Sequence, residues 1–474
     1  MSSPIRQLFR RRSAGGDSLL RLPWLRPLVV AQLFSSVGNA MAMLAVAYLS
    51  FTSANSLLHT VMVATAYSLP AAFVGGWSGR LADTRDHRKV VFTTSAVSIA
   101  IWLGVTGLEV AELLNPWWLT VSSFFAGFAG AVQFPSWQEL ERQLVPSERL
   151  QEANALFSSA GSMARIFGAV AGGVLVTWIG AGWVFVFNAV TFVPLMVVVV
   201  RIPASPPKDV KAHKRVRLRD ALQYARKEPA VRLALRLVII LTLLAVPIAK
   251  LLPAVADELG GEAHNLGILT AFYSLGGSLV AILLHRLTKH RSKSALVAPA
   301  VLACGVSLVI IGITGDRLGG AGRQVAVLAL LVPIGLGLAM AQAVLSATVQ
   351  VSASEEMESE VIALYAAVVS IVTPIGGFAL AGVADATTVW LAVAIAGGGL
   401  AVIAVAMYFL TPLELTTIDP SNQHDAAVDH GHHLSAQPVG FIHPGQFHPL
   451  TVGRRRRRSS QVSSSSEAAT PSGL

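Results

Sequence analysis

The chain alternates between long apolar runs and short polar connections, and this alternation limits the folds open to it. Stretches such as 28–59 and 294–315 contain no Asp, Glu, Lys or Arg. A helix needs about 20 apolar residues to cross the hydrocarbon of a bilayer. Only 13% of the residues are charged, whereas a soluble chain carries about a quarter. The sequence therefore predicts an integral membrane protein.

Twelve apolar runs have the length of a membrane span, which predicts an all-α protein. Their expected limits are 27–51, 57–79, 90–108, 116–135, 154–178, 181–200, 233–256, 264–284, 294–314, 324–350, 361–384 and 386–411. We expect five regions in the chain: an N-terminal tail (1–26), six spans (27–200), a central loop (201–232), six more spans (233–411) and a disordered C-terminal tail (412–474). Within the central loop, RLRDALQYARKEP is typical of a short amphipathic helix.

The distribution of basic residues predicts the orientation of the spans. Of the 36 Lys and Arg residues, three lie inside predicted spans, and only Arg317 and Arg323 lie in the connections after odd-numbered spans. Because Lys and Arg favour cytoplasmic connections, we expect both tails to be cytoplasmic.

Several classes of function receive no support from the sequence. The single cysteine, Cys304, lies in an apolar run, which excludes a disulfide framework and favours a small core residue. We find no nucleophile–base set and no spacing typical of metal ligands, so we expect no enzyme, no cofactor and no metal site. A run of arginines at 454–458 favours contact with anionic lipid rather than nucleic acid.

The stretch GRLADTRDHRKVV, residues 79–91, concentrates charge between the second and third spans. Its composition resembles a loop of the major facilitator superfamily, which has a Gly, an apolar pair, an Asp and basic residues at this place. The matching positions are Gly79, Leu81, Ala82, Asp83, Arg88 and Lys89. Asp86 stands where the commonest form has a second Gly, which is similar to the drug and siderophore exporter branch that includes the enterobactin exporter.

The fifth span carries a second resemblance to that branch. In SMARIFGAVAGG, residues 162–173, the glycines Gly168, Gly172 and Gly173 match, while Ala169 replaces the family's proline. The segment FPSWQELERQLVPSERLQEANAL, residues 134–156, resembles the branch's connection before that span. The resemblance covers about 22–411 and implies two six-helix bundles and an export function.

For the charged loop the resemblance implies a cytoplasmic gating latch. In this interpretation Gly79 permits close approach of another backbone, and Asp83 accepts hydrogen bonds from an adjacent helix N-terminus. Asp86, Arg88 and Lys89 complete the gating motif. The alternative is a solvated turn that only sets topology through its charge.

Ionisable residues inside a span are costly and mark candidate sites. Arg165 lies near the middle of the fifth span, as a substrate ligand or as a structural residue, and Lys250 lies toward the outer end of the seventh, where it binds substrate or snorkels. Asn39, Gln133 and Gln342 are uncharged candidates, each also able to form an interhelical hydrogen bond. No Asp or Glu falls within a span as drawn, which favours an anionic or zwitterionic substrate and leaves the coupling ion open.

Three functions remain in consideration. The first is export of a small amphipathic or anionic molecule, drug-like or siderophore-like, by alternating access in the cell membrane, either coupled to an ion or as facilitated movement. The second is transport of a lysophospholipid-type lipid by the same fold. The third is a membrane sensor or scaffold that transports nothing.

Overall fold

The computed structural model describes residues 19, 22, 24–203, 218–287, 296–354 and 357–410. These residues form helices and their connections, without any strand. The helices are α2 (Leu25–Ala54), α3 (Leu57–Thr84), α4 (His87–Val110), α5 (Pro116–Leu144), α6 (Leu150–Ile179), α7 (Ala181–Arg201), α8 (Leu218–Lys227), α9 (Pro229–Leu244), α10 (Ile248–Glu258), α11 (Ala263–Leu287), α12 (Val297–Arg317), α13 (Gly320–Val351), α14 (Glu358–Ala386) and α15 (Val389–Leu410). The all-α fold is confirmed.

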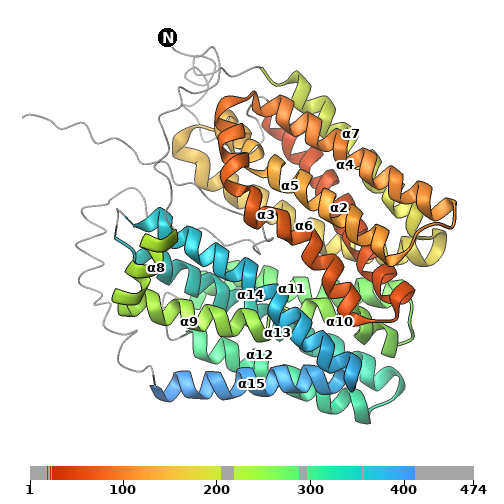
Figure 1. Cartoon of the computed structure of the whole chain (residues 1–474), viewed down its shortest axis with the longest axis vertical. Helices are drawn as coiled ribbons and strands as arrows, with labels where there is room; N and C mark the ends of the chain where they lie inside the picture. The colour runs from red at the N-terminus through yellow and green to blue at the C-terminus, as the bar shows by residue number, and fades with distance from the viewer. Residues whose placement is uncertain are drawn as a thin grey trace, which may run out of the picture.

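The helices form two groups, seen in Figure 1 as a red-to-yellow set (α2 to α7) and a green-to-blue set (α9 to α15). Within the first group α3 packs on α5, α4 on α7, and α2 on α6 and α7. Within the second, α12 packs on α15, and α13 on α11 and α12. Each group contributes most of one apolar core, and the core of the second group also takes in Leu44, Leu57, Val61 and Ala169 of the first. We call α2–α7 the first half and α9–α15 the second half.

Ten helical segments of the described chain are long and apolar enough to cross a membrane, with α9 and α10 counted together. Helices α5 and α11, of 29 and 25 residues, lie beside them in the bundles. The count of twelve is consistent with this arrangement and stays a prediction, as does the orientation.

Local sequence explains where the helices begin. The carboxylate of Asp86 accepts a hydrogen bond from the backbone N–H of Arg88 and caps α4. The side chain of Asn115 caps α5 in the same way, and Pro116, whose missing N–H costs nothing in a first turn, follows it. The predicted amphipathic helix of the central loop is confirmed as α8, which lies against α14.

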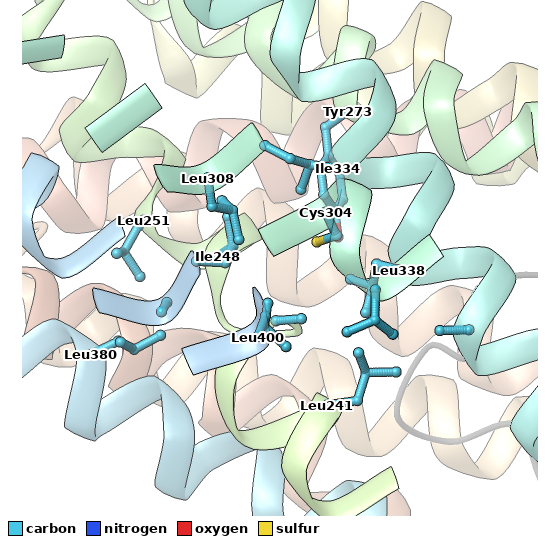
Figure 2. Close-up of a cluster of buried hydrophobic side chains, with 14 of the residues drawn as sticks. Leu241, Ile248, Leu251, Tyr273, Cys304, Leu308, Ile334, Leu338, Leu380 and Leu400 are labelled. Carbon is cyan, nitrogen blue, oxygen red and sulfur yellow. The ribbon is translucent and has the colours of Figure 1, made fainter. Parts of the chain in front are cut away.

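Cys304 lies in the core of the second half, as the sequence predicts. Figure 2 shows its sulfur among Tyr273, Ile334 and Leu338, and the residue is fully buried. This packing agrees with a small core residue rather than a reactive thiol.

Two predicted spans are wrong in their limits. The fourth, expected over 116–135, continues through Pro135 to Leu144, because Trp137, Leu140 and Leu144 form one buried face at helical spacing. The added turns bring Glu139 and Glu141 into a helix.

Glu109 also falls inside a helix, one residue before the end of α4. Its side chain lies against Gly182 of α7. The expectation that no acidic residue lies within a spanning helix is therefore wrong at helix ends.

The seventh span, expected to be continuous over 233–256, is broken between α9 and α10. Pro247 has no N–H and cannot bond the carbonyl of Leu243, four residues earlier. That carbonyl instead lies against Gly376 of α14, where an added Cβ would come within 2.1 Å of it. The absence of a side chain at Gly376 thus leaves room for the carbonyl of Leu243 at the break between α9 and α10.

Candidate functional site

Four hydrogen-bonded or close backbone contacts between described residues of the two halves lie toward one end of the molecule. We call it the odd end, because it carries the connections after the odd-numbered predicted spans: α2–α3, α4–α5, α6–α7, α10–α11, α12–α13 and α14–α15. The opposite end is the even end. In Figure 1 the halves meet on the right, where α10 lies, and spread apart toward α8.

A carboxylate of the second half caps a helix of the first at the odd end. Asp385, in the last turn of α14, accepts hydrogen bonds from the hydroxyl of Ser56 (2.8 Å) and from the backbone N–H groups of Leu57 (3.0 Å) and Leu58 (3.2 Å). These are unpaired donors in the first turn of α3, where the helix dipole favours an anion. Ser56 makes no capping bond of its own. Asp385 therefore ties α3 to α14.

Helices α6 and α11 touch through their backbones. A Cβ added at Gly173 would lie 2.7 Å from the carbonyl oxygen of Ala263 and 3.0 Å from the Cα of Gly267. A Cβ added at Gly267 would lie 2.6 Å from the carbonyl oxygen of Ala169. Glycine is required at both positions for this close approach.

The other two glycines of the predicted exporter motif face a different helix. Gly168 and Gly172 pack on α2, where an added Cβ would come within 2.6 Å of Ala40 and 2.9 Å of Met41. The motif therefore holds α6 between α2 of its own half and α11 of the other.

Two further hydrogen bonds join the halves at the odd end. The Tyr48 hydroxyl donates to the carbonyl of Gly261 (3.2 Å), and the backbone N–H of His264 donates to the Thr177 hydroxyl (3.1 Å). Together with Asp385 and the α6–α11 contact they form what we call the seal. The seal connects the halves without a single ion pair among its described atoms.

The charged stretch between α3 and α4 lies at the even end and bonds within its own half. Two guanidinium nitrogens of Arg88 donate to the carboxylate of Asp86, at 2.6 and 3.0 Å, and the third donates to the carbonyl of Ile202 at the end of α7 (2.6 Å). The hydrogen bonds from Arg88 hold the pKa of Asp86 below its ordinary value.

The remaining residues of the predicted latch make no described contact with the second half. Lys89 is exposed. Gly79 has no heavy atom within 4 Å of the place where a Cβ would stand, so the expected close approach is not seen there. The side chain of Asp83 is outside the described residues. The gating role of this stretch stays a prediction.

The predicted ligands stand on five different helices, and the hydrogen bonds described for them are with other residues. Arg165, at the middle of α6, donates from its Nη2 to the Ser162 hydroxyl (2.9 Å). Gln133 of α5 accepts a hydrogen bond from Thr94 of α4 (3.2 Å), the interhelical role considered as its alternative. Asn39 in α2 and Gln342 in α13 are half-buried.

Lys250 differs from these residues. It stands in the first turn of α10, and its Nζ is buried without a hydrogen-bond partner among the described residues. Its Cδ lies 3.8 Å from the place where a Cβ on Gly377 of α14 would stand, and Val61 of α3 borders the same place at 2.9 Å. It is therefore placed where the halves meet.

Sequence reasoning missed the role of Asp385, which it placed in a connection. One signal was present: Ser56 precedes an apolar run and is typical of a helix N-cap. Nothing local indicates that a residue more than three hundred positions later supplies the cap. The C-terminal tail, with its arginines and histidines, lies outside the described residues.

Comparison with known proteins gives one family match that covers most of the chain. The model of the transmembrane secretion effector family, a group of the major facilitator superfamily, matches residues 16–437. An uncharacterised MFS-type transporter YfiS from Bacillus subtilis (strain 168) is 26% identical over 213 residues, 43% of this chain and 50% of that protein. The putative multidrug resistance protein MdtD of Enterobacter sp. (strain 638) is 29% identical over 133 residues, 28% of this chain and 27% of that protein. The chain thus matches half or less of the length of these relatives.

Solved structures share the fold at low identity. A bacterial homologue of the iron transporter ferroportin, in an inward-facing state, has a TM-score of 0.64 at 17% identity and covers 83% of this chain and 99% of its own. A bacterial homologue of the lysosomal transporter Spinster, inward-facing and unoccupied, has a TM-score of 0.61 at 13% identity, with 86% and 97% covered.

Proposed function

Because the chain belongs to the transmembrane secretion effector family of major facilitator transporters, we propose that it exports a small amphipathic or anionic molecule across the cell membrane by alternating access. The family and the structural neighbours are transporters. The finer points, namely export, substrate type and membrane, are our inference.

The main structural support for alternating access is the seal. In alternating access two halves stay rigid and rock about a site between them. Here most of each core belongs to one half, and the hydrogen bonds between described residues of the two halves lie at the odd end. The positive-inside rule assigns the odd end to the outside. The structure then corresponds to an inward-facing state, the state given for the ferroportin and Spinster homologues.

Similarity favours drug-like molecules as substrates. The MdtD relative is named as a putative multidrug resistance protein, and the charged stretch 79–91 resembles drug and siderophore exporters. We propose that an ion couples to transport and that the basic tails contact anionic lipid. The ion is unidentified.

The test is an efflux assay in a bacterial host that lacks its own drug pumps. Cells expressing the full chain are loaded with a panel of dyes, antibiotics and siderophores, and loss from the cells is followed with and without an uncoupler. We expect faster loss of at least one compound than in cells with an empty vector, and slower loss when the uncoupler is present.

Two results would redirect the proposal. If the compound leaves the cells equally fast with and without the uncoupler, transport is not coupled to an ion gradient, and facilitated export remains. A chain that reaches the membrane, shown by fractionation, yet moves neither the panel nor a fluorescent lysophospholipid contradicts a transport function and favours the sensor.

A further inference from the structure

Lys250 is a buried amine without a partner in the part of the chain that the structure describes. Among the described residues its Nζ has no hydrogen-bond partner and takes part in no ion pair. An ammonium without water or a partner is among the most costly groups to place inside a membrane-spanning bundle. A residue of this kind is retained only where something compensates it.

Snorkelling does not offset the cost of burying the Lys250 amine. A lysine that serves only to reach the membrane surface extends its amine into water. Lys250 lies in the first turn of α10, about 12 Å of helix from Glu258 at the odd end, and its Nζ is buried. Its side chain runs beside Gly377 toward the boundary between the halves.

The position is shared by three helices from both halves. Gly377 of α14 is the point of contact: an added Cβ there would meet Val61 of α3 at 2.9 Å and the Cδ of Lys250 at 3.8 Å. Glycine keeps this boundary narrow beside the amine. A ligand held at Nζ would therefore touch both halves.

Lys250 also lies on the even-end side of the seal. Gly377 is about two helical turns before Asp385 along α14, and Val61 is about one turn after Leu57 along α3. A molecule that entered between the halves from the even end would reach Lys250 before the seal.

The broken helix fixes the position of the amine along the predicted span. Because α9 ends at Leu244 and α10 begins at Ile248, the N-terminus of α10 stands inside the predicted seventh span, with Lys250 in its first turn. The N-terminal end of a helix dipole favours an anion.

We propose that Lys250 is the counter-ion for a carboxylate of the transported molecule, bound between α3, α10 and α14 beneath the seal. This inference rests on the proposed transport function and narrows its substrate class to small organic anions. The bound carboxylate supplies the partner that the amine lacks, and it contacts both halves at the point where they separate.

The test measures ligand-induced stabilisation of the purified full chain in detergent. The probes are benzoate, salicylate, decanoate and citrate, each with its neutral amide or ester. We expect at least one carboxylate to raise Tm of the wild type in a saturable way while its neutral partner does not. Lys250→Met should weaken that carboxylate at least about tenfold, and Lys250→Arg should retain it.

A second measurement separates binding from a structural role. Without ligand, Lys250→Met should raise Tm, since an apolar side chain of similar length replaces an unpaired charge. Arg236→Met is the matched control: this arginine is exposed on α9 and its loss should change neither Tm nor carboxylate binding. A lower Tm for Lys250→Met without ligand, or equal carboxylate binding by wild type and Lys250→Met, overturns the proposal, as does a panel in which no carboxylate exceeds its neutral partner.

The two proposals fail in different ways. Efflux of neutral or cationic compounds by a chain that binds no carboxylate refutes the role of Lys250 and leaves export standing. Carboxylate binding that depends on Lys250 in a chain that moves nothing supports the site and refutes transport.

Discussion

The two ends of α3 are held in different ways. At its start a carboxylate from the second half, Asp385, receives the free N–H groups of the first turn. Beyond its end, Asp86 and Arg88 bond each other and the carbonyl of Ile202, all within the first half. The first arrangement joins the halves, whereas the second only ties helices of one half together.

Under the proposed alternating access, the difference indicates which contacts break during transport. Rocking of the halves separates Asp385 from α3 and α6 from α11, because these atoms belong to different halves. The bonds of Arg88 need not change, since α3, α4 and α7 move together. In this structure Asp86 and Arg88 brace their own half.

Locking the seal should have the largest effect. In a Cys304→Ala background, Ser56→Cys and Asp385→Cys together place two thiols where a hydrogen bond of 2.8 Å now stands. Oxidation should cross-link them and abolish efflux, and reduction should restore it. Each single cysteine variant is the control. Undiminished efflux from the fully cross-linked protein, with the link shown by mass spectrometry, would refute the seal as a moving contact.

Widening the α6–α11 contact should open the seal. In Gly173→Ala the new methyl meets backbone atoms at 2.7 and 3.0 Å, and overpacking of this kind costs about 1–3 kcal/mol. We expect a Val61→Cys reporter, buried under the seal, to react faster with a membrane-impermeant maleimide, by roughly 5- to 150-fold. Gly398→Ala is the control, because an added Cβ there meets nothing within 4 Å. Equal labelling rates in both variants would contradict the prediction.

Removing the Asp385 carboxylate should also open the seal, with a smaller effect than Gly173→Ala. Asp385→Ala leaves the first N–H groups of α3 without their partner, which costs about 0.5–2 kcal/mol for a typical helix cap. The same cysteine reporter should label faster than in the unsubstituted protein. Asp316→Ala removes an exposed carboxylate with no described partner and should leave labelling unchanged. Slower labelling in Asp385→Ala would show that the carboxylate opposes closure.

The bonds between Asp86 and Arg88 at the even end should contribute least to stability, and their contribution should depend on pH. Because the folded-state pKa of Asp86 is lowered from 3.8, its stabilisation is present above that value and is lost as the pH falls through the lower folded value. Asp86 is partly exposed, so Asp86→Asn should cost about 1 kcal/mol or less at pH 7.

Thermal unfolding of wild type and Asp86→Asn at several pH values checks this dependence. The difference in Tm should shrink as the pH falls below about 4. Asp220→Asn, on the exposed surface of α8, is the control and should show no such difference. A difference that grows on acidification would contradict the assigned sign.

Local sequence patterns predicted those helices whose limits depend only on neighbouring residues. The run 181–200 gave α7 within one residue, because Gly180 precedes it and Arg201 ends it. The amphipathic pattern after residue 216 gave α8 for the same kind of reason. The extension of α5 past Pro135 depends on a tertiary partner for Trp137 and Leu140, which no span count includes.

The candidate site was less predictable, for physical reasons. Lys250 was identified because a charge in an apolar run is costly wherever the run folds. Its relation to Gly377 and Val61 depends on how the halves meet. Asp385 looked like an ordinary connection residue, since its value comes only from the helix end placed opposite it.

The backbone contact between α6 and α11 also bears on the speed of the transition. Side chains that interlock must change rotamers before two helices can move past each other. Gly173 and Gly267 present no side chains to interlock, so α6 can roll on α11 with little friction. Under the proposed alternating access, the glycines would therefore lower the activation barrier between the two states, while Asp385 would stabilise one of them.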